Sequence, residues 1–257
     1  MFVLPIASDV AAAYLARDVG GNVEPLVSLR HDEDVLCRGV ITDDRVIGVL
    51  VAGRQWPGGP LTAMIETGER EVLVALAGAL PTGVTQLALH RPWMLPVLET
   101  CLRITPVPRD ELLVLTASAL ALPALPAAPE VRLLTEADTA VVVASSTPWG
   151  LEGFTDALRH GYRPFGVVRG ERVLARAMAA YTTGYTEEVS AVWTAPAWRG
   201  KGLATIVAAT VAADILSRVP LATYTVRPFN LASQRVAAKT GFVLDHRTHT
   251  YPVHGRR

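Results

Sequence analysis

A short glycine-punctuated loop between an apolar strand and a long apolar helix constrains this sequence more than any other stretch. Residues 188–194 are rich in β-branched and aromatic side chains, which favours a strand. Arg199-Gly-Lys-Gly202 follows, and residues 203–219 then place apolar side chains at helical spacing. The first turn of such a helix presents unpaired N–H groups and the positive end of the helix dipole. The sequence therefore predicts a strand–loop–helix unit whose loop holds an anionic group.

Two common phosphate-binding motifs do not fit this loop. A nucleotide P-loop requires Ser or Thr directly after the lysine, but Lys201 is followed by Gly202. The dinucleotide motif G-x-G-x-x-G is also absent here. For the loop taken alone, an ordinary strand–turn–helix with solvated basic residues stays open as an alternative.

The loop resembles the acetyl-CoA motif of the GNAT superfamily of N-acetyltransferases, [QR]-x-x-G-x-[GA], in the form Arg199-x-x-Gly202-x-Ala204. A second segment, Asn230-Leu-Ala-Ser233 followed by Gly241-Phe242, resembles the N-x-x-[AS]…G-F segment of the same family. Taken alone, Asn230 would be interpreted as a helix N-cap. The two motifs together identify residues 131–253 as similar to a GNAT domain.

The resemblance implies that the second half of the chain binds acetyl-CoA as a co-substrate. Family members bind pantetheine through backbone groups of the strand before the loop, so this strand is expected to splay from the strand at 221–226, which a bulge would allow. The cofactor-binding residues implied are Val192, Trp193, Thr194, Arg199, Gly200, Lys201, Gly202, Leu203, Ala204, Asn230 and Ser233.

Acetyl transfer to an amine requires the neutral amine, which is only about one part in a thousand of an alkyl amine near pH 7. The candidate general base is Glu188, because some GNAT enzymes carry a glutamate at this distance before the loop. Glu187 points to the opposite face of the strand, since strand side chains alternate. A solvated edge charge is the competing interpretation of both carboxylates, and it is favoured for Glu187.

The departing thiolate takes up a proton, and many GNAT enzymes use a tyrosine seven residues after the motif asparagine. That position is Ala237 here, so the usual acid is missing. The branch of the family that acetylates ribosomal-protein N-termini often has a serine three residues after the asparagine, which matches Ser233. We therefore assign Ser233 as the candidate acid, with helix capping or an unassisted thiolate as alternatives.

Composition excludes several classes of function. The chain has 257 residues, no net formal charge and half of its residues apolar, so it lacks the basic excess of a nucleic-acid binder. We expect no metal site, since His246 and His249 lie on opposite faces of a predicted strand. Two cysteines, Cys37 and Cys101, fit a reduced compartment, and we see neither a signal peptide nor a membrane helix. These features predict a cytoplasmic protein with no membrane or nucleic-acid partner.

Proline-rich residues 122–129 predict a linker between an N-terminal α/β domain at 1–121 and a GNAT acetyltransferase domain at 130–257. The segment beginning at Gly39 resembles the one beginning at Gly166, which suggests that the first half is a degenerate GNAT-like copy; chance similarity is the alternative. The first half lacks the loop motif, so we place no cofactor there. The predicted fold class is α/β (α+β), with a mixed central sheet flanked by helices and two tandem GNAT-like halves.

These features predict an acetyl-CoA-dependent N-acetyltransferase that acts on a primary amine, either a small molecule or a peptide N-terminus. The missing tyrosine at Ala237 keeps a second hypothesis open, a non-catalytic acyl-CoA-binding or sensor protein. The sequence leaves open the amine acceptor, the preferred acyl chain, any ligand of the first half and the oligomeric state.

Overall fold

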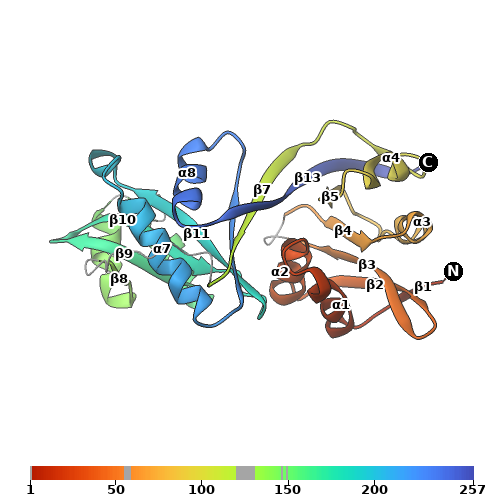
Figure 1. The fold of residues 1–257 in the computed structure, drawn as a ribbon, viewed down its shortest axis with the longest axis horizontal. Helices are drawn as coiled ribbons and strands as arrows, with labels where there is room; N and C mark the ends of the chain where they lie inside the picture. The colour runs from red at the N-terminus through yellow and green to blue at the C-terminus, as the bar shows by residue number, and fades with distance from the viewer. Residues whose placement is uncertain (1, 55–58, 120–130, 146, 149) are drawn as a thin grey trace. The chain divides into compact units, whose positions relative to one another are not determined.

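The structure, a computed structural model, describes residues 2–54, 59–119, 131–145, 147–148 and 150–257 (Figure 1). These residues form two compact units, one of Met1–Leu113 with His246–Arg257 and one of Val114–Asp245. The end of β7 (Asp110–Ala117) therefore groups with the second unit, and most of β13 (Val243–Arg256) groups with the first. The predicted linker at 122–129 lies outside the described residues.

The first unit contains a mixed sheet with the strand order β1-β2-β3-β4-β5-β13, and β6 pairs with β13. Its one parallel pair among the pairings described is β4 with β5, and the other pairs are antiparallel. The elements are β1 (Val3–Pro5), α1 (Ser8–Leu15), α2 (Val23–His31), β2 (Leu36–Thr42), β3 (Arg45–Gly53), β4 (Thr62–Thr67), α3 (Arg70–Gly78), β5 (Gln86–Leu89), α4 (Met94–Leu98), β6 (Leu102–Ile104) and the start of β7.

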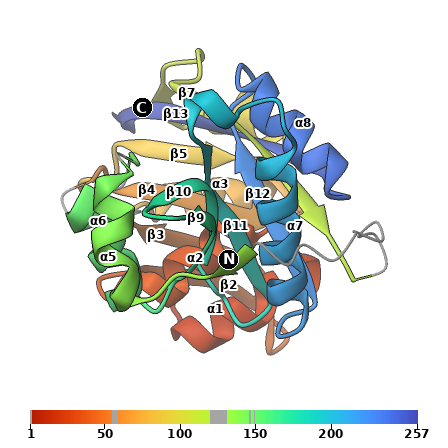
Figure 2. The same cartoon turned by 90° about the vertical axis from the view of Figure 1, so that its left-hand side faces the viewer.

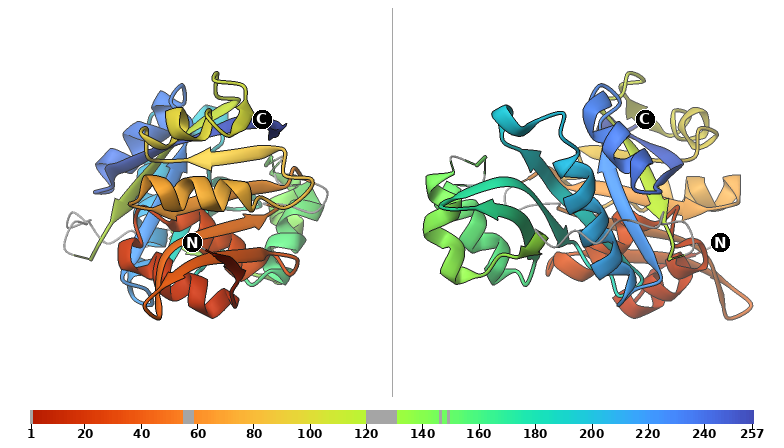
Figure 3. Two further views of the ribbon diagram at one scale, coloured as in Figure 1. Left: turned by 90° about the vertical axis from the view of Figure 1, so that its right-hand side faces the viewer. Right: turned by 60° about the vertical axis from the view of Figure 1, so that its left-hand side comes forward.

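Two apolar layers cover the two faces of this sheet. On one face α3 packs through Val72, Leu73 and Leu76 against Leu50 and other buried strand residues. On the opposite face Leu15 of α1 and Leu26 of α2 pack with a second set of strand residues. Alternating side chains of β3 serve the two layers in turn, as strand geometry requires. The left view of Figure 3 shows α3, in gold, lying across the strands.

The second unit repeats this order of elements. Its sheet runs β7-β12-β11-β10-β9-β8, with β11 and β12 parallel. The elements are β8 (Val131–Leu133), a 3₁₀ turn (Glu136–Asp138), α5 (Thr139–Ala144), α6 (Gly150–Arg159), β9 (Arg163–Arg169), β10 (Arg172–Ala180), β11 (Thr186–Thr194), a 3₁₀ turn (Pro196–Trp198), α7 (Leu203–Leu216), β12 (Leu221–Val226), α8 (Leu231–Lys239) and the start of β13.

Helices lie on both faces of the second sheet as well (Figure 2). The long helix α7 packs along β10 and β11, and buried alanines at 208, 209 and 212 let it approach the strands closely. On the other face α5 and α6 contribute Val142 and Phe154 to a cluster with Val173 of β10. The unit is therefore a three-layer sandwich. The loop before α7 lies beyond the end of β11, an inner strand of the sheet.

Two matched glycines support the interpretation of the halves as tandem copies. A side chain at Gly39 of β2 would meet Ile6, and one at Gly166 of β9 would meet Leu134. In each unit the glycine therefore makes room for the residue that follows the first strand. The hairpins after these strands also match, since Asp43, Asp44 and Gly170 all take positive φ. The predicted mixed α/β fold is confirmed, and its two halves are alike in their order of elements.

Several elements differ from the sequence prediction. The sequence pattern predicts a helix at 95–102, but the structure has a shorter helix, α4, followed by strand β6. The pattern also predicts two strands, at 242–245 and 248–253, where the structure has one continuous strand, β13. Strand β4 and helix α2 were not predicted. Every residue of β4 is buried, so it lacks the alternating pattern that marks a half-buried strand.

The start of the second unit offers a test of its folding energetics. Asp138 completes a capping box with Thr135 and receives Arg132 at 2.6 Å, which lowers its pKa to about 2. A depressed carboxyl pKa stabilises the fold above its ordinary value of 3.8, and this is lost as the pH falls toward about 2. We expect Asp138→Asn to cost about 2 kcal/mol at neutral pH, measured by urea unfolding. The exposed neighbour change Glu136→Gln should cost much less, and equal losses would contradict this assignment.

Candidate functional site

The site begins where two parallel strands of the second unit separate. Pairing of β11 with β12 covers only Thr186 to Glu188, although β11 continues to Thr194. Beyond Glu188 the register of β11 against β10 also shifts, and Ala191 adopts a positive φ of 53°. One extra residue in β11 is thereby accommodated as a β-bulge. The splay and the bulge that the sequence analysis expected are both present, and we call this opening the β11–β12 fork.

Arg176 of β10 holds the bulge in place. Its Nη1 donates to the carbonyl oxygen of Ala191 at 2.7 Å, and its guanidinium lies 5.9 Å from the ring centre of Trp193. Burial lowers the pKa of Arg176 to about 9, so the side chain stays charged at neutral pH. A charge-assisted hydrogen bond to a backbone carbonyl is a strong constraint in a buried place. The Arg176 side chain thus fixes the conformation of the bulge.

The loop before α7 is shaped by two glycines. Gly200 and Gly202 have φ of 77° and 80°, a conformation that glycine adopts without strain. A Cβ at either position would meet no atom within 4 Å, so the loop leaves open space at the helix start. The first helical hydrogen bond of α7 runs from the Ile206 N–H to the Gly202 carbonyl. The three N–H groups before Ile206 therefore face the loop without an intrahelical partner, an arrangement that favours an anion.

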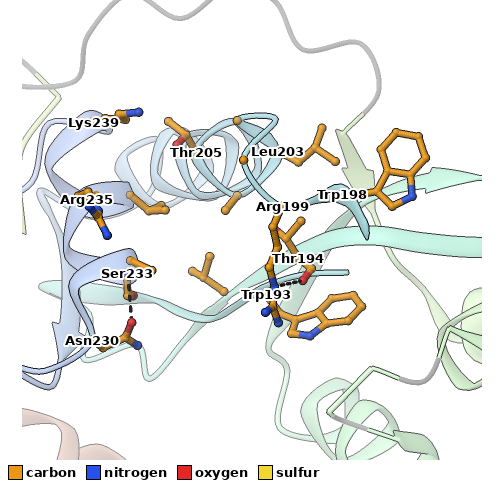
Figure 4. Close-up of a pocket in the computed structure, with 16 residues that line it drawn as sticks. Trp193, Thr194, Trp198, Arg199, Leu203, Thr205, Asn230, Ser233, Arg235 and Lys239 are labelled. Atoms are coloured by element: carbon orange, nitrogen blue, oxygen red, sulfur yellow. Dashed lines mark hydrogen bonds between the residues drawn. The ribbon is translucent and has the colours of Figure 1, made fainter. Parts of the chain in front are cut away.

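A cavity of about 570 Å³ lies between this loop, the end of β11 and α8 (Figure 4). Every predicted cofactor-binding residue except Lys201 lines it. The hydroxyl oxygen of Thr194 is buried there and has no hydrogen-bond partner among the described residues. The lining residues are Val192, Trp193, Thr194, Trp198, Arg199, Gly200, Gly202, Leu203, Ala204, Thr205, Asn230, Ala232, Ser233, Arg235, Val236 and Lys239.

Positive charge surrounds the cavity. Arg199 donates from Nε to the carbonyl oxygen of Thr194 at 3.3 Å, so its guanidinium braces the end of β11. Lys201 instead lies over the Trp198 ring, 4.4 Å from its centre. Arg235 and Lys239 line the α8 side, and the sequence analysis missed both (Figure 4). Their spacing of four residues could have identified them, because residues four apart share a helix face.

Glu188 lies at the vertex of the fork, partly exposed. Its carboxylate accepts a hydrogen bond from Oγ1 of Thr225 at 3.0 Å. Burial raises the pKa of Tyr162 to about 12, and the charges of Tyr181 and Glu188 add to the shift. Burial likewise raises the pKa of Tyr181, again with a contribution from Glu188. The Tyr162 and Tyr181 ring centres are 5.2 Å apart, so the carboxylate sits beside an aromatic pair.

Ser233 lies at the start of α8, with two partners. Its N–H donates to Oδ1 of Asn230 at 3.1 Å, so Asn230 caps the helix. Its hydroxyl is 2.7 Å from the hydroxyl of Tyr224, a residue of β12 that is 2 % exposed. Ala237, where the family has its tyrosine, is buried. The structure therefore brings a different phenol to the serine, and no local sequence pattern pointed to Tyr224.

Glu187 is not the solvated edge charge that the sequence analysis favoured. It is 3 % exposed and accepts hydrogen bonds from Arg163 at 2.8 Å and from Arg218 at 3.2 Å. Asp214 of α7 binds the same two arginines. Burial raises the pKa of Glu187, while Arg163 opposes that shift. The opposite face of β11 is covered by α7, so a carboxylate there needs ion pairs to remain charged.

Part of the chain resembles a known protein family in sequence. Residues 150–251 match the family model described as GNAT acetyltransferase. Over these residues the chain is similar to the GNAT acetyltransferase family. No curated protein sequence matches the chain significantly.

Solved GNAT structures resemble the whole chain in fold. A GNAT-family acetyltransferase from Colwellia psychrerythraea has a TM-score of 0.60 at 14 % identity and covers 99 % of this chain and 100 % of its own. A tandem GNAT protein from the clavulanic acid biosynthesis pathway, without acetyl-CoA, gives 0.58 at 17 %, covering 98 % and 97 %. A GCN5-related N-acetyltransferase from Sphaerobacter thermophilus gives 0.58 at 14 %, covering 98 % and 94 %. At such identities the likeness concerns the fold alone.

Two further features are absent from the described residues. Across the part of the chain that is described, no group of His, Cys, Asp and Glu side chains is arranged to hold a metal ion. Within the same residues, no helix is long and apolar enough to cross a membrane.

Neighbouring carboxylates on β11 provide a matched test of this site. Glu187→Gln removes the shared anion from two arginines in a buried network and should lower stability by about 2 kcal/mol. Glu188→Gln keeps a hydrogen-bond acceptor for Thr225 and should change stability by less than about 0.5 kcal/mol. Urea unfolding of both variants measures this difference. Equal losses would mean that the two faces of β11 do not differ as described.

Proposed function

We propose that the protein is an acetyl-CoA-dependent N-acetyltransferase that transfers the acetyl group to a primary amine. The observation that carries this proposal is the cavity at the open fork, which combines a helix N-terminus, flanking cations and an orphaned Thr194 hydroxyl. The partly exposed carboxylate of Glu188 stands at the vertex of that fork. The GNAT match over residues 150–251 supports the same reaction.

The charge and the open strand edge of the cavity suit acetyl-CoA. The pyrophosphate would accept hydrogen bonds from the N–H groups at the start of α7, where the dipole favours negative charge. Arg235 and Lys239 supply charge from the other wall. The unpaired edge of β11 at Val192 to Thr194 offers backbone groups to the pantetheine amides, as a neighbouring strand would. The bound molecule supplies a thioester whose carbonyl carbon accepts the amine.

Glu188 prepares the amine. An ammonium loses its proton to this carboxylate, directly or through water. Having an alkyl amine neutral near pH 7 costs roughly 4 kcal/mol. The free amine then forms the new C–N bond while the C–S bond breaks. Thr225 orients the carboxylate through its hydrogen bond. Tyr162 and Tyr181 form an aromatic wall beside it, which suits an amine with an apolar or aromatic body.

Ser233 protonates the departing thiolate in this proposal, and Tyr224 supports it. The serine hydroxyl gives its proton to sulfur, and the phenol 2.7 Å away replaces it. Burial raises the pKa of Tyr224, while the Ser233 hydrogen bond opposes that rise. The nitrogen loses two protons, one to Glu188 before the attack and one to solvent as the amide forms, and sulfur gains one through Ser233. One proton is therefore released over the cycle, and exchange with solvent restores Glu188 and the hydroxyl pair.

A second function remains in view because Ala237 replaces the family's tyrosine. A protein that binds acyl-CoA without turning it over would act as a sensor. Release of free thiol from acetyl-CoA with a panel of primary amines separates the two hypotheses, because a sensor releases none.

We also propose residues 122–129 as the linker between halves at 1–121 and 130–257. We further propose a cytoplasmic location, which the free thiols of Cys37 and Cys101 favour.

Gly202→Asp tests the CoA site. The new carboxylate would stand at the cradle where the pyrophosphate binds, so calorimetry should show CoA affinity reduced by about a hundredfold or more. Gly170→Asp is the matched control, since Gly170 also has positive φ with open space but lies in the β9–β10 hairpin. The control should cost similar stability and keep CoA affinity. Unchanged affinity in Gly202→Asp would remove the site assignment.

Glu188→Gln tests the base. The amide keeps the Thr225 contact but accepts no proton, so turnover should fall by about a hundredfold or more while CoA affinity is kept. Steady-state rates with acetyl-CoA and the best amine of the panel measure this. Glu171→Gln, in the exposed β9–β10 hairpin, is the control and should leave the rate unchanged. A normal rate in Glu188→Gln would take the role of base away from this residue.

Ser233→Ala and Tyr224→Phe test the acid together. If the pair protonates sulfur, Ser233→Ala should slow turnover about tenfold or more with little change in CoA affinity. Tyr224→Phe should slow it less, because the serine hydroxyl remains. A normal rate with a lowered melting temperature in both variants would mean that the pair is structural and that the thiolate leaves unassisted.

A further inference from the structure

A small polar cavity lies in the first unit, on the side of the sheet covered by α1 and α2. Its polar lining is Asn22, Glu24, Glu66 and His90, and its apolar lining comes from α1, α2 and strands β3 to β5. The space accommodates about one water-sized group. No function assigned above uses this cavity.

Asn22 directs an unpaired acceptor into this cavity. Its side-chain amide donates both hydrogens, to the carbonyls of Leu15 at 3.1 Å and Asp18 at 3.0 Å. This pattern fixes which amide atom is oxygen, because only nitrogen can donate. The residue is 2 % exposed, and its Oδ1 has no hydrogen-bond partner among the described residues. Buried amide oxygens are nearly always hydrogen-bonded, so this one calls for a donor.

Two carboxylates share the cavity with Asn22. Glu24 accepts from Oγ1 of Thr248 at 2.9 Å, and Glu66 accepts from Arg91 at 2.6 Å and lies 3.3 Å from Nε2 of His90. Burial raises the pKa of both carboxyl groups. A cation in the cavity would favour their ionised forms and offset part of that burial.

We propose that this cavity binds the ammonium head of a small primary amine, with Asn22, Glu24 and Glu66 as its three acceptors. A primary ammonium carries three N–H donors on a group close to water in size, which matches three acceptors around a water-sized space. A metal ion fits less well, since no suitable His, Cys, Asp and Glu group occurs in the described chain.

The place of Glu66 in the sheet supports this ligand. Pairing of β4 with β5 ends at Met64, and the two strands separate beyond it. We call this opening the fork of the first unit, and Glu66 lies just inside it. Glu188 stands at the corresponding vertex of the second unit, and each carboxylate contacts the side chain at or beside the end of the next strand, His90 or Thr225. The first unit thus keeps an acidic fork without the glycine loop that cradles a pyrophosphate. Acetyl-CoA does not enter this inference and the second unit serves only as a comparison, so the amine site can be tested separately from the proposed reaction.

Nuclear magnetic resonance of the full chain tests the proposal through the side-chain amide of Asn22. Titration with ammonium, methylammonium and butylammonium ions should shift the Asn22 amide signals saturably, and the three ions show how much alkyl chain the site accepts. Tetramethylammonium, which has the charge but no N–H donor, should leave them unmoved. A titration without any shift, or an equal shift with tetramethylammonium, would overturn the proposal. So would a long-lived water at Asn22 that no amine displaces.

Glu24→Gln adds a matched comparison. Removing this charge should weaken methylammonium binding by about tenfold, while Glu33→Gln, at an exposed position after α2, should leave it unchanged. Equal affinity in both variants would overturn the role of Glu24. Should Glu24→Gln fail to fold, the comparison of methylammonium with tetramethylammonium in the unaltered chain still decides the proposal.

Discussion

The site depends on the interruption of one hydrogen-bond ladder. Strands β11 and β12 pair only as far as Glu188, and the bulge at Ala191 keeps the remainder of β11 from pairing again. An unpaired parallel strand edge is costly unless something else binds it. The hydrogen bond from Arg176 to the Ala191 carbonyl offsets part of this unfavourable free energy. The edge from Val192 to Thr194 stays open toward the cavity. The acyl-CoA site proposed here fills that edge.

The two GNAT-like units differ at the start of one helix. In the second unit α7 begins at Gly202, whose backbone is left-handed and which carries no capping side chain. In the first unit α3 begins after Glu69, which also lacks a side-chain cap, and Glu71 in its first turn adds a second negative charge. An acidic helix start repels a pyrophosphate. Arg91 also binds Glu66 inside the fork of the first unit. The same fold therefore offers a CoA cradle in one unit only.

Local chemistry explains which features the sequence could predict. The glycine loop at 199–202 and the Asp43-Asp44 turn need particular backbone angles, so their residues identify them directly. The place of β13 beside β5 left no such mark, because the partners of a strand are set by residues that are distant in the sequence. Tyr224 was missed for the same reason, since its contact with Ser233 depends on how α8 returns over β12. The ion pairs of Glu187 likewise join three separate elements.

The stoichiometry of CoA binding tests the central claim most directly. Isothermal titration of the full chain with CoA should give one site per chain, because only the second unit combines an open fork with a glycine-led helix start that has no acidic residue in its first turn. Gly202→Asp in the same experiment should leave no site. Two sites per chain, or one site that survives Gly202→Asp, would contradict the account and move CoA binding to the first unit.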